Sequence, residues 1–194
     1  MYWETVKGAF SFHELYQDMV NKCKNDAIFV EIGIWHGKSI IYLAEKIIES
    51  KKKIKLYGID IFKGTDHEYF NDVLIENNVL YNAYLKNIEP VKNYIITIIG
   101  DSHEVYKQFK DHSIDFCFID ADHSYKAVKE DLVCWFPKIK KNGIIAGHDY
   151  TPRCAVKKAV DDFFPNKVQE LPGANWVFER HIGGKFEGKK IYDN

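Results

Sequence analysis

Several residue types and sequence patterns are scarce or absent in this chain of 194 residues, and each limits the functions that the protein can have. Arginine occurs only at Arg153 and Arg180, and the formal net charge is -1. Few guanidinium groups are therefore available for bidentate phosphate recognition, and no basic excess favours a nucleic-acid backbone. The 4 cysteines lack C-x-x-C spacing, which predicts buried thiols in a reducing compartment. No apolar run is long enough to span a membrane. The composition thus predicts a cytoplasmic protein with no nucleic-acid or membrane partner.

The length of the chain suits one α/β domain with a full core. Ser11 is followed three residues later by Glu14. This is the pattern of a helix capping box, and it predicts a leading helix that runs to about Lys24. We expect three parts: a helical lead-in over residues 1–25, the main domain over 26–182, and a polar tail over 183–194.

Short β-branched or aromatic runs alternate with helical patterns along most of the chain. The strand-like runs are 27–33, 54–60, 94–99, 114–119 and 143–147. The helical patterns are 38–50, a stretch within 66–89, 102–110, 123–137 and 153–164. Such alternation is typical of parallel strands whose crossover helices cover both faces of the sheet. Two last strand-like runs, 166–171 and 175–180, predict an antiparallel hairpin. The expected fold is an α/β, Rossmann-like three-layer sandwich whose mainly parallel seven-stranded sheet ends in an antiparallel hairpin.

The turn after the first strand-like run is the most informative segment. An apolar run ends in Glu31, then Gly33 and Gly37 follow, and a helical pattern begins at Ser39. Bare glycine backbone at a helix N-terminus lets a flat cofactor approach closely. A dinucleotide fingerprint would read G-x-G-x-x-G, but His36 stands where the third glycine would be. A carboxylate at this turn would repel a pyrophosphate, and it would suit a cofactor that carries an ammonium and a sulfonium group.

This E-x-G-x-x-x-G sequence resembles motif I of the class I S-adenosylmethionine-dependent methyltransferases. The resemblance implies S-adenosylmethionine as the cofactor, with Glu31, Gly33, Gly37 and Ser39 among the residues that hold it. It extends over about residues 26–180, because acids also follow the next strands in the expected order.

Asp60 and the pair Asp101–Ser102 end the second and third strand-like runs. Asp60 can accept both ribose hydroxyl groups of an adenosine cofactor, or it can be an ordinary turn residue. Asp101 can accept a hydrogen bond from the adenine amino group. Asp101 or Ser102 can also cap the helix that follows, and both functions can hold at once. We expect all three residues at the cofactor.

A second group of polar residues follows the fourth and fifth strand-like runs. Asp120 and His123 come after the fourth run, and His148 and Asp149 after the fifth. Because adjacent parallel strands end at the same sheet edge, we expect Asp120 and Asp149 to lie close together near the reactive end of the cofactor. Two carboxylates so close are unfavourable unless a cation or a proton lies between them.

This arrangement resembles the metal-dependent small-molecule O-methyltransferases of the catechol O-methyltransferase type. In that family an Asp after each of these two strands holds a divalent cation that binds the hydroxyl oxygen of the substrate. Two positions depart from that pattern, because Tyr150 stands where Asn is usual and His123 where Lys is common. The sequences D-x-D-H-S-Y and G-H-D-Y are more similar to a bacterial small-molecule branch, methyltransferase family 24.

His148 can serve this site in two ways. As a third metal ligand beside Asp120 and Asp149, it would favour a transition ion over magnesium. As a general base, it would deprotonate the acceptor without a metal. We therefore expect His148, Asp149 and His123 as catalytic residues and Asp120, Asp149 and His148 as metal ligands, with Asp120 also touching the cofactor.

The sequence favours an enzyme that transfers a methyl group from S-adenosylmethionine to oxygen on a small metabolite, with assistance from a divalent cation. Three alternatives stay open. They are a metal-independent methyltransferase with a His general base, a nicotinamide-dependent oxidoreductase, and a non-catalytic adenosyl-binding protein. The second would require a glycine at position 36 and no acid at Glu31, and the third would need neither Asp120 nor Asp149. A homodimer is a further open expectation.

Overall fold

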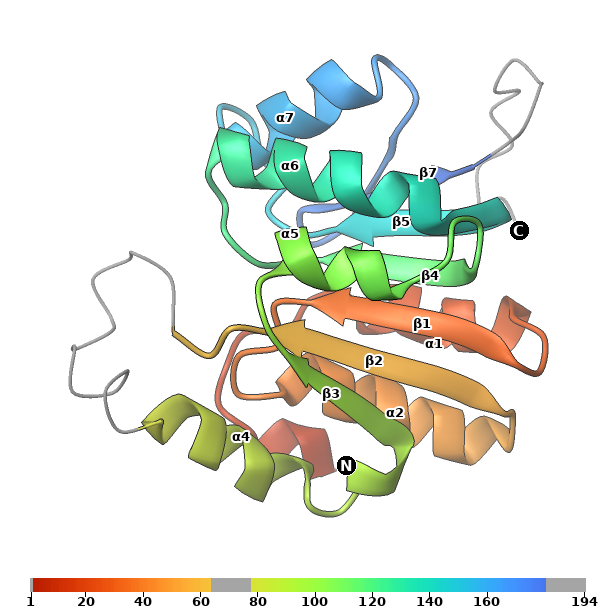
Figure 1. Cartoon of the computed structure of the whole chain (residues 1–194), viewed down its shortest axis with the longest axis vertical. Coiled ribbons are helices and arrows are strands. Elements are labelled where there is room, and N and C mark those ends of the chain that lie inside the picture. Colours follow the sequence, from red (N-terminus) through yellow and green to blue (C-terminus); the bar gives the residue numbers. More distant parts are fainter. Residues whose placement is uncertain (1, 64–77, 181–194) are drawn as a thin grey trace.

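A computed structural model describes residues 2–63 and 78–180. Its centre is a seven-stranded sheet in the order β3-β2-β1-β4-β5-β7-β6 (Figure 1). The strands are β1 (Ala27–Ile32), β2 (Ile54–Asp60), β3 (Ile95–Ile99), β4 (Ile114–Ile119), β5 (Ile139–Gly147), β6 (Gln169–Leu171) and β7 (Asn175–Glu179). The first five strands are parallel, whereas β7 is antiparallel to both β5 and β6. The expected sheet with its antiparallel hairpin is therefore confirmed.

Helices cover both faces of the sheet and make a three-layer sandwich. They are α1 (His13–Lys22), α2 (Lys38–Ser50), α4 (Val79–Ile88), α5 (Ser102–Val105), α6 (Tyr125–Trp135) and α7 (Ala155–Phe163). Short 3-10 helices span Tyr2–Thr5, Lys92–Tyr94, Tyr106–Gln108 and Phe136–Lys138. Figure 1 shows α5 and α6 in front of the sheet and α1 and α2 behind it.

Each face of the sheet has its own apolar core. Phe29 of β1 packs into the core formed with α1, α2 and α4, whereas Val30 and Ile32 pack into the core formed with α5, α6 and α7. This alternation follows from the two-residue period of a strand. It also places Glu31 on the same face as Phe29, beneath α1 and α2.

Some boundaries differ from the sequence expectation. Strand β5 begins at Ile139 rather than at 143, because the polar residues Lys140, Lys141 and Asn142 made its first half resemble a loop. The helix expected over 102–110 is shorter, since α5 ends at Val105 and a 3-10 turn follows. Much of the helical stretch expected within 66–89, and the tail over 183–194, lie outside the described residues.

The capping box at Ser11 was a wrong prediction. Helix α1 begins at His13, and Phe12 occupies the N-cap position without a capping side-chain hydrogen bond. Phe12 is buried and stacks on Phe118, with ring centroids 4.3 Å apart. Burial of this ring draws the chain inward, and Ser11 binds elsewhere, as described below. Within the described part of the chain, none of the helices is both long and apolar enough to cross a bilayer.

Candidate active site

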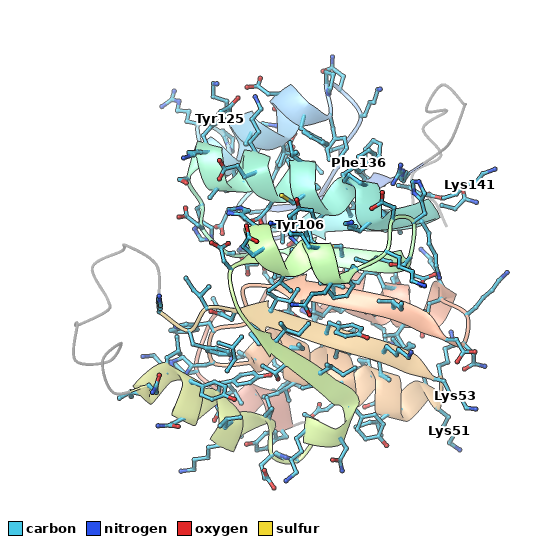
Figure 2. All side chains as sticks on the ribbon, in the orientation of Figure 1. Lys51, Lys53, Tyr106, Tyr125, Phe136 and Lys141 are labelled. Atoms are coloured by element: carbon cyan, nitrogen blue, oxygen red, sulfur yellow. The ribbon has the colours of Figure 1, made fainter. Side chains whose placement is uncertain are left out.

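The carboxyl ends of β1, β2, β4 and β5 meet at one edge of the sheet, where most of the expected site residues lie. Register pairs Ile32 with Ile119 and Ile119 with Gly147, so these strand ends are level. Figure 2 shows Lys51, Lys53 and Lys141 at the opposite end of the sheet. Their charges are therefore remote from this edge.

The two glycines of the turn after β1 are required by close packing. Gly33 has a φ of +83°, and a Cβ there would lie 2.0 Å from the carbonyl oxygen of Asp120. Gly37 has a φ of +87° at the N-cap of α2, where a Cβ would approach the Tyr84 ring at 3.0 Å. Both positions favour glycine because positive φ is costly for a residue with a side chain. The turn thus lies directly against the end of β4.

Glu31 lies beneath this turn and is 1% exposed. Its Oε1 accepts a hydrogen bond from the Ser39 hydroxyl. Its Oε2 and the neighbouring Tyr16 hydroxyl have no hydrogen-bond partner of good geometry among the described residues. Burial raises the pKa of the Glu31 carboxyl to about 8, while the hydroxyls of Ser39 and the neighbouring Tyr16 act in the opposite direction. The free oxygen is suited to a cationic donor such as an ammonium group. Ser39 acts on Glu31, and its expected contact with the cofactor stays a prediction.

Asp60 organises the glycine turn. Its Oδ2 accepts hydrogen bonds from the backbone N–H groups of Ile34 and Trp35, both at 2.9 Å. Its Oδ1 accepts from the N–H of Phe62 at 2.7 Å. A carboxylate has about four acceptor positions, so most of its capacity is used within the protein. The turn function that the sequence left open is present, and the expected contact with two ribose hydroxyls stays a prediction.

Asp101 and Ser102 take part in local structure. Asp101 is the N-cap of α5 and accepts from the N–H of His103 at 2.9 Å. The Ser102 hydroxyl donates to Asp131 Oδ1 at 2.6 Å. The capping alternative is therefore present in the structure. Contact of Asp101 and Ser102 with the cofactor stays a prediction.

The ion pair between His103 and Asp131 was not expected from the sequence. Asp131 is 1% exposed on the inner face of α6, and His103 Nε2 lies 3.3 Å from its Oδ1. Contact with Asp131 raises the pKa of the His103 imidazole to about 9, against the opposing effect of burial. In the sequence, Asp131 falls on the apolar stripe formed by Val128, Leu132 and Trp135. An acid at such a position was the signal that could have indicated a buried partner. The pair connects α5 to α6, and it lies apart from the acids and imidazoles that follow β4 and β5.

A cluster of two acids and two imidazoles lies at the ends of β4 and β5, and we call it the acid–imidazole cluster. Its members are Asp120, His123, His148 and Asp149. His123 Nε2 lies 3.1 Å from Asp149 Oδ2 and 3.6 Å from Asp120 Oδ1. His148 Nδ1 lies 3.2 Å from Asp149 Oδ2 and 3.9 Å from Asp120 Oδ1. The structure therefore brings the two carboxylates together, and two imidazoles lie between them.

Backbone hydrogen bonds and one unusual backbone conformation fix the positions of the residues in this cluster. The N–H of Asp120 donates to the Ile32 carbonyl, and the N–H of His148 donates to the Ile119 carbonyl. Asp149 has a φ of +56°, which is uncommon for a residue with a side chain. Such conformations persist where the surroundings determine them, and they gather at functional sites.

The charges in the cluster balance one another. Hydrogen bonding to Asp120, with help from Asp149, raises the pKa of the His123 imidazole. Burial alone would lower the pKa of His148, but Asp149 and Asp120 outweigh it and raise that pKa. His148 and His123 in turn lower the pKa of the Asp149 carboxyl. The acids therefore favour the protonated form of each imidazole, and in that form the ring offsets part of the repulsion between the acids.

Three of these residues are also arranged as metal ligands. Asp120, His123 and Asp149 each offer one ligand atom, and these atoms all lie within 4.8 Å of one another. Two carboxylates and an imidazole suit a transition ion such as Mn²⁺ or Fe²⁺ as well as Mg²⁺. The imidazole of this group belongs to His123, whereas His148 was expected from the sequence. The ligand role of His148 stays a prediction.

A small cavity adjoins the cluster between the sheet, α6 and α7. It is lined by Ile119, Asp120, Ala121, Asp122, His123, Val128, His148, Val156 and Trp176. Its lining therefore combines apolar side chains with the acids and imidazoles that follow β4 and β5.

The fold and this site define a class I methyltransferase: a parallel sheet ending in an antiparallel hairpin, a glycine turn after β1, and acids at the carboxyl ends of the strands. Residues 30–150 match the family model of a methyltransferase domain. The chain belongs to this family, methyltransferase family 24, as the sequence resemblance indicated. The family assignment sets aside the nicotinamide-dependent alternative.

Similar proteins agree with this fold. A curated relative, an uncharacterized protein of Acanthamoeba polyphaga mimivirus, is 32% identical over 132 residues, which are 66% of this chain and 53% of the relative. The chain thus spans about half the length of that relative. The O-methyltransferase NovP superposes with a TM-score of 0.65 at 17% identity, covering 87% of this chain and 79% of NovP. A putative caffeoyl-CoA O-methyltransferase from Staphylococcus aureus gives a TM-score of 0.63 at 16% identity, covering 91% and 86%. An rRNA methylase from Streptococcus thermophilus gives 0.59 at 10% identity, covering 88% and 95%.

Proposed function

We propose that this protein transfers a methyl group from S-adenosylmethionine to a hydroxyl oxygen of a small metabolite, and that Asp120, His123 and Asp149 hold a divalent cation for this reaction. The observation that carries the proposal is the convergence of these three side chains beside the glycine turn. S-adenosylmethionine supplies an electrophilic methyl group, and a bound cation lowers the pKa of an acceptor hydroxyl.

The residues of the glycine turn would hold the cofactor. Glu31 Oε2 is buried and without a partner in the described chain, so it can accept a hydrogen bond from an ammonium group. Asp60 holds the N–H groups of Ile34 and Trp35 and so fixes the shape of the turn. Because Gly33 touches the backbone of Asp120, a cofactor on the turn would lie next to the acid–imidazole cluster.

The cluster would bind and orient the acceptor. His123 and His148 both point a ring nitrogen at Asp149, so removal of a proton from either ring removes a positive charge beside that carboxylate. Cation binding requires a neutral His123, so the cation competes with a proton on this ring, whose pKa the two acids raise. The apolar walls of Val128, Val156 and Trp176 would exclude water from that side of the cluster.

A small acceptor is supported by the charge of the chain. The net charge of -1 and the presence of only two arginines disfavour a nucleic-acid substrate. The names of two structural neighbours describe O-methyltransferases, while a third is an rRNA methylase, so the fold alone does not select the acceptor. Location in the cytoplasm and a homodimer stay predictions.

Calorimetry with S-adenosylhomocysteine and Mn²⁺ tests this proposal. We expect S-adenosylhomocysteine to bind with an affinity between about micromolar and millimolar, and NAD to bind more weakly. Asp149→Asn should abolish Mn²⁺ binding and leave S-adenosylhomocysteine binding nearly intact. Asp18→Asn, on the outer side of α1, is the matched control. Tighter binding of NAD than of S-adenosylhomocysteine would contradict the function, and Mn²⁺ binding that survives Asp149→Asn would contradict the metal site.

A metal-independent methyltransferase is the second candidate. The observation in its favour is that His148 Nδ1 lies 3.2 Å from Asp149, as in a base oriented by a carboxylate. Its other ring nitrogen is already hydrogen-bonded to Ser11, and its raised pKa favours the protonated ring over the neutral base. This candidate requires methyl transfer that is insensitive to a chelator and is lost in His148→Ala. A protein that binds S-adenosylhomocysteine but transfers no methyl group would be the non-catalytic alternative.

A further inference from the structure

Ser11 reaches the cluster from a segment that is far away in the chain. Its Oγ lies 3.0 Å from His148 Nε2 and donates a hydrogen bond to the Gly173 carbonyl oxygen, also at 3.0 Å. The cap of α1 does not use this side chain. One hydroxyl therefore connects the N-terminal lead-in, the imidazole after β5 and the turn between β6 and β7.

The residues packed around Ser11 hold its hydroxyl at this contact. Gly173 has a φ of +76°, and a Cβ there would lie 2.9 Å from both Cβ and Oγ of Ser11. Any larger residue at position 173 would push Ser11 away. On the other side, the buried ring of Phe12 stacks on Phe118, and its centroid lies 5.4 Å from that of the His148 ring. The place of the Ser11 hydroxyl is thus set by its neighbours, although the residue itself is exposed.

The contact decides which edge of the His148 ring faces the acids. An imidazole presents Nε2 and Nδ1 on opposite sides. With Nε2 at Ser11, Nδ1 lies 3.2 Å from Asp149 Oδ2 and 3.9 Å from Asp120 Oδ1. A half-turn of the ring would remove Nε2 from the hydroxyl and bring ring carbons toward both carboxylates. Without Ser11, the preference for the observed orientation would rest on the two acids and on the Gly173 backbone.

We propose that Ser11 is a positioning residue for His148, whose hydroxyl holds the imidazole with Nδ1 toward Asp120 and Asp149. The orientation itself is a property of this structure. Its consequence for metal binding and methyl transfer rests on the proposed function. His148 is a metal ligand that the sequence predicts, and a partner that lies behind a ligating imidazole commonly changes metal affinity by about 10- to 100-fold.

Nuclear magnetic resonance of the ring nitrogens tests the orientation directly and needs neither a metal nor an acceptor. Protein labelled with ¹⁵N-histidine is compared at one pH and temperature as wild type, Ser11→Ala and Ser113→Ala, with His148→Gln to assign the His148 signals. Ser113 is the matched control, because its hydroxyl bonds to the Lys110 carbonyl in an exposed turn. We expect the Nε2 environment of His148 to change in Ser11→Ala alone. Identical His148 signals in wild type and Ser11→Ala would overturn the proposal.

Mn²⁺ titration in a double-mutant cycle tests the consequence. We expect Ser11→Ala to weaken Mn²⁺ binding by about 10-fold, the lower end of the range for such partners, while S-adenosylhomocysteine affinity and the melting temperature stay unchanged. In a His148→Ala background, the same change should cause no further loss, because the ring it acts on is gone. An equal loss in both backgrounds would show that Ser11 acts on the fold and would overturn the proposal. If the wild type binds no Mn²⁺, the metal part of the proposed function fails, and the resonance comparison still decides the orientation.

Discussion

Gly33 and Asp120 are packed so closely that a Cβ at position 33 would lie 2.0 Å from the Asp120 carbonyl oxygen. This contact joins the glycine turn after β1 to the residue that begins the acid–imidazole cluster after β4. One backbone approach therefore sets the distance between the turn proposed to hold the cofactor and the side chains proposed to act on the acceptor.

Gly33→Ala tests how tight this contact is. The added methyl group would meet backbone atoms that cannot rotate away, and it would also require an alanine at a φ of +83°. We expect a loss of about 3 kcal/mol or more in the free energy of unfolding, measured by urea denaturation. Gly37→Ala is the matched control, because its Cβ would approach only side-chain atoms, of Tyr84 at 3.0 Å and of Ile88 at 3.4 Å, and the change should cost about 1–2 kcal/mol. Equal losses in the two variants would contradict the argument.

The succession of strands and helices along the chain could be predicted from the sequence because it depends on local patterns. Apolar runs separated by amphipathic stretches indicate parallel strands and crossover helices, and the structure contains them in that order. The meeting of Asp120 and Asp149 was also predictable, since neighbouring parallel strands end at the same edge.

Partners that depend on packing between distant segments could not be predicted. Ser11 has the sequence pattern of a helix cap, yet it lies against His148 because Phe12 is drawn into the core. The sequence left a turn role open for Asp60, but it did not show that the turn after β1 folds onto this residue and uses its oxygens. The burial of Glu31 and Asp131 depends on helices that pack over them. Local periodicity does not show which polar atom such a helix will cover.

Asp60→Ala should affect stability as well as cofactor binding. The change removes the acceptor for three backbone N–H groups, at Ile34, Trp35 and Phe62. We expect the free energy of unfolding of the cofactor-free protein to fall by about 2–4 kcal/mol and S-adenosylhomocysteine binding to weaken. Asp101→Ala is a control that removes one helix cap, at a cost of about 1 kcal/mol. An Asp60→Ala protein of unchanged stability would show that these three bonds contribute little.

His103 should make stability depend on pH on the alkaline side. Its pKa is raised to about 9 in the folded protein by Asp131, compared with an ordinary value of 6.5. The folded state therefore binds the proton more tightly, so its stabilisation is complete below about pH 6.5 and is lost as the pH rises through about 9. Because the imidazole is partly exposed, we expect a loss of only about 1 kcal/mol. Urea denaturation at pH 6.5 and 9.5 should show this loss in wild type, and a smaller loss in His103→Gln. The same pH dependence in both proteins would contradict this role of the ion pair.

Glu31 should release a proton when the cofactor binds. Burial raises the pKa of its carboxyl to about 8, so the group is mostly neutral at pH 6.5 in the free protein. An ammonium group at Oε2 would favour the carboxylate form and lower that pKa. We expect S-adenosylhomocysteine binding at pH 6.5 to release close to one proton from this group, with less release above pH 8, where the carboxyl is already ionised. Calorimetry in two buffers of different ionisation enthalpy measures the number of protons, and Glu31→Gln should bind more weakly and lose this release. Equal proton release by wild type and Glu31→Gln would show that Glu31 does not face the ammonium group.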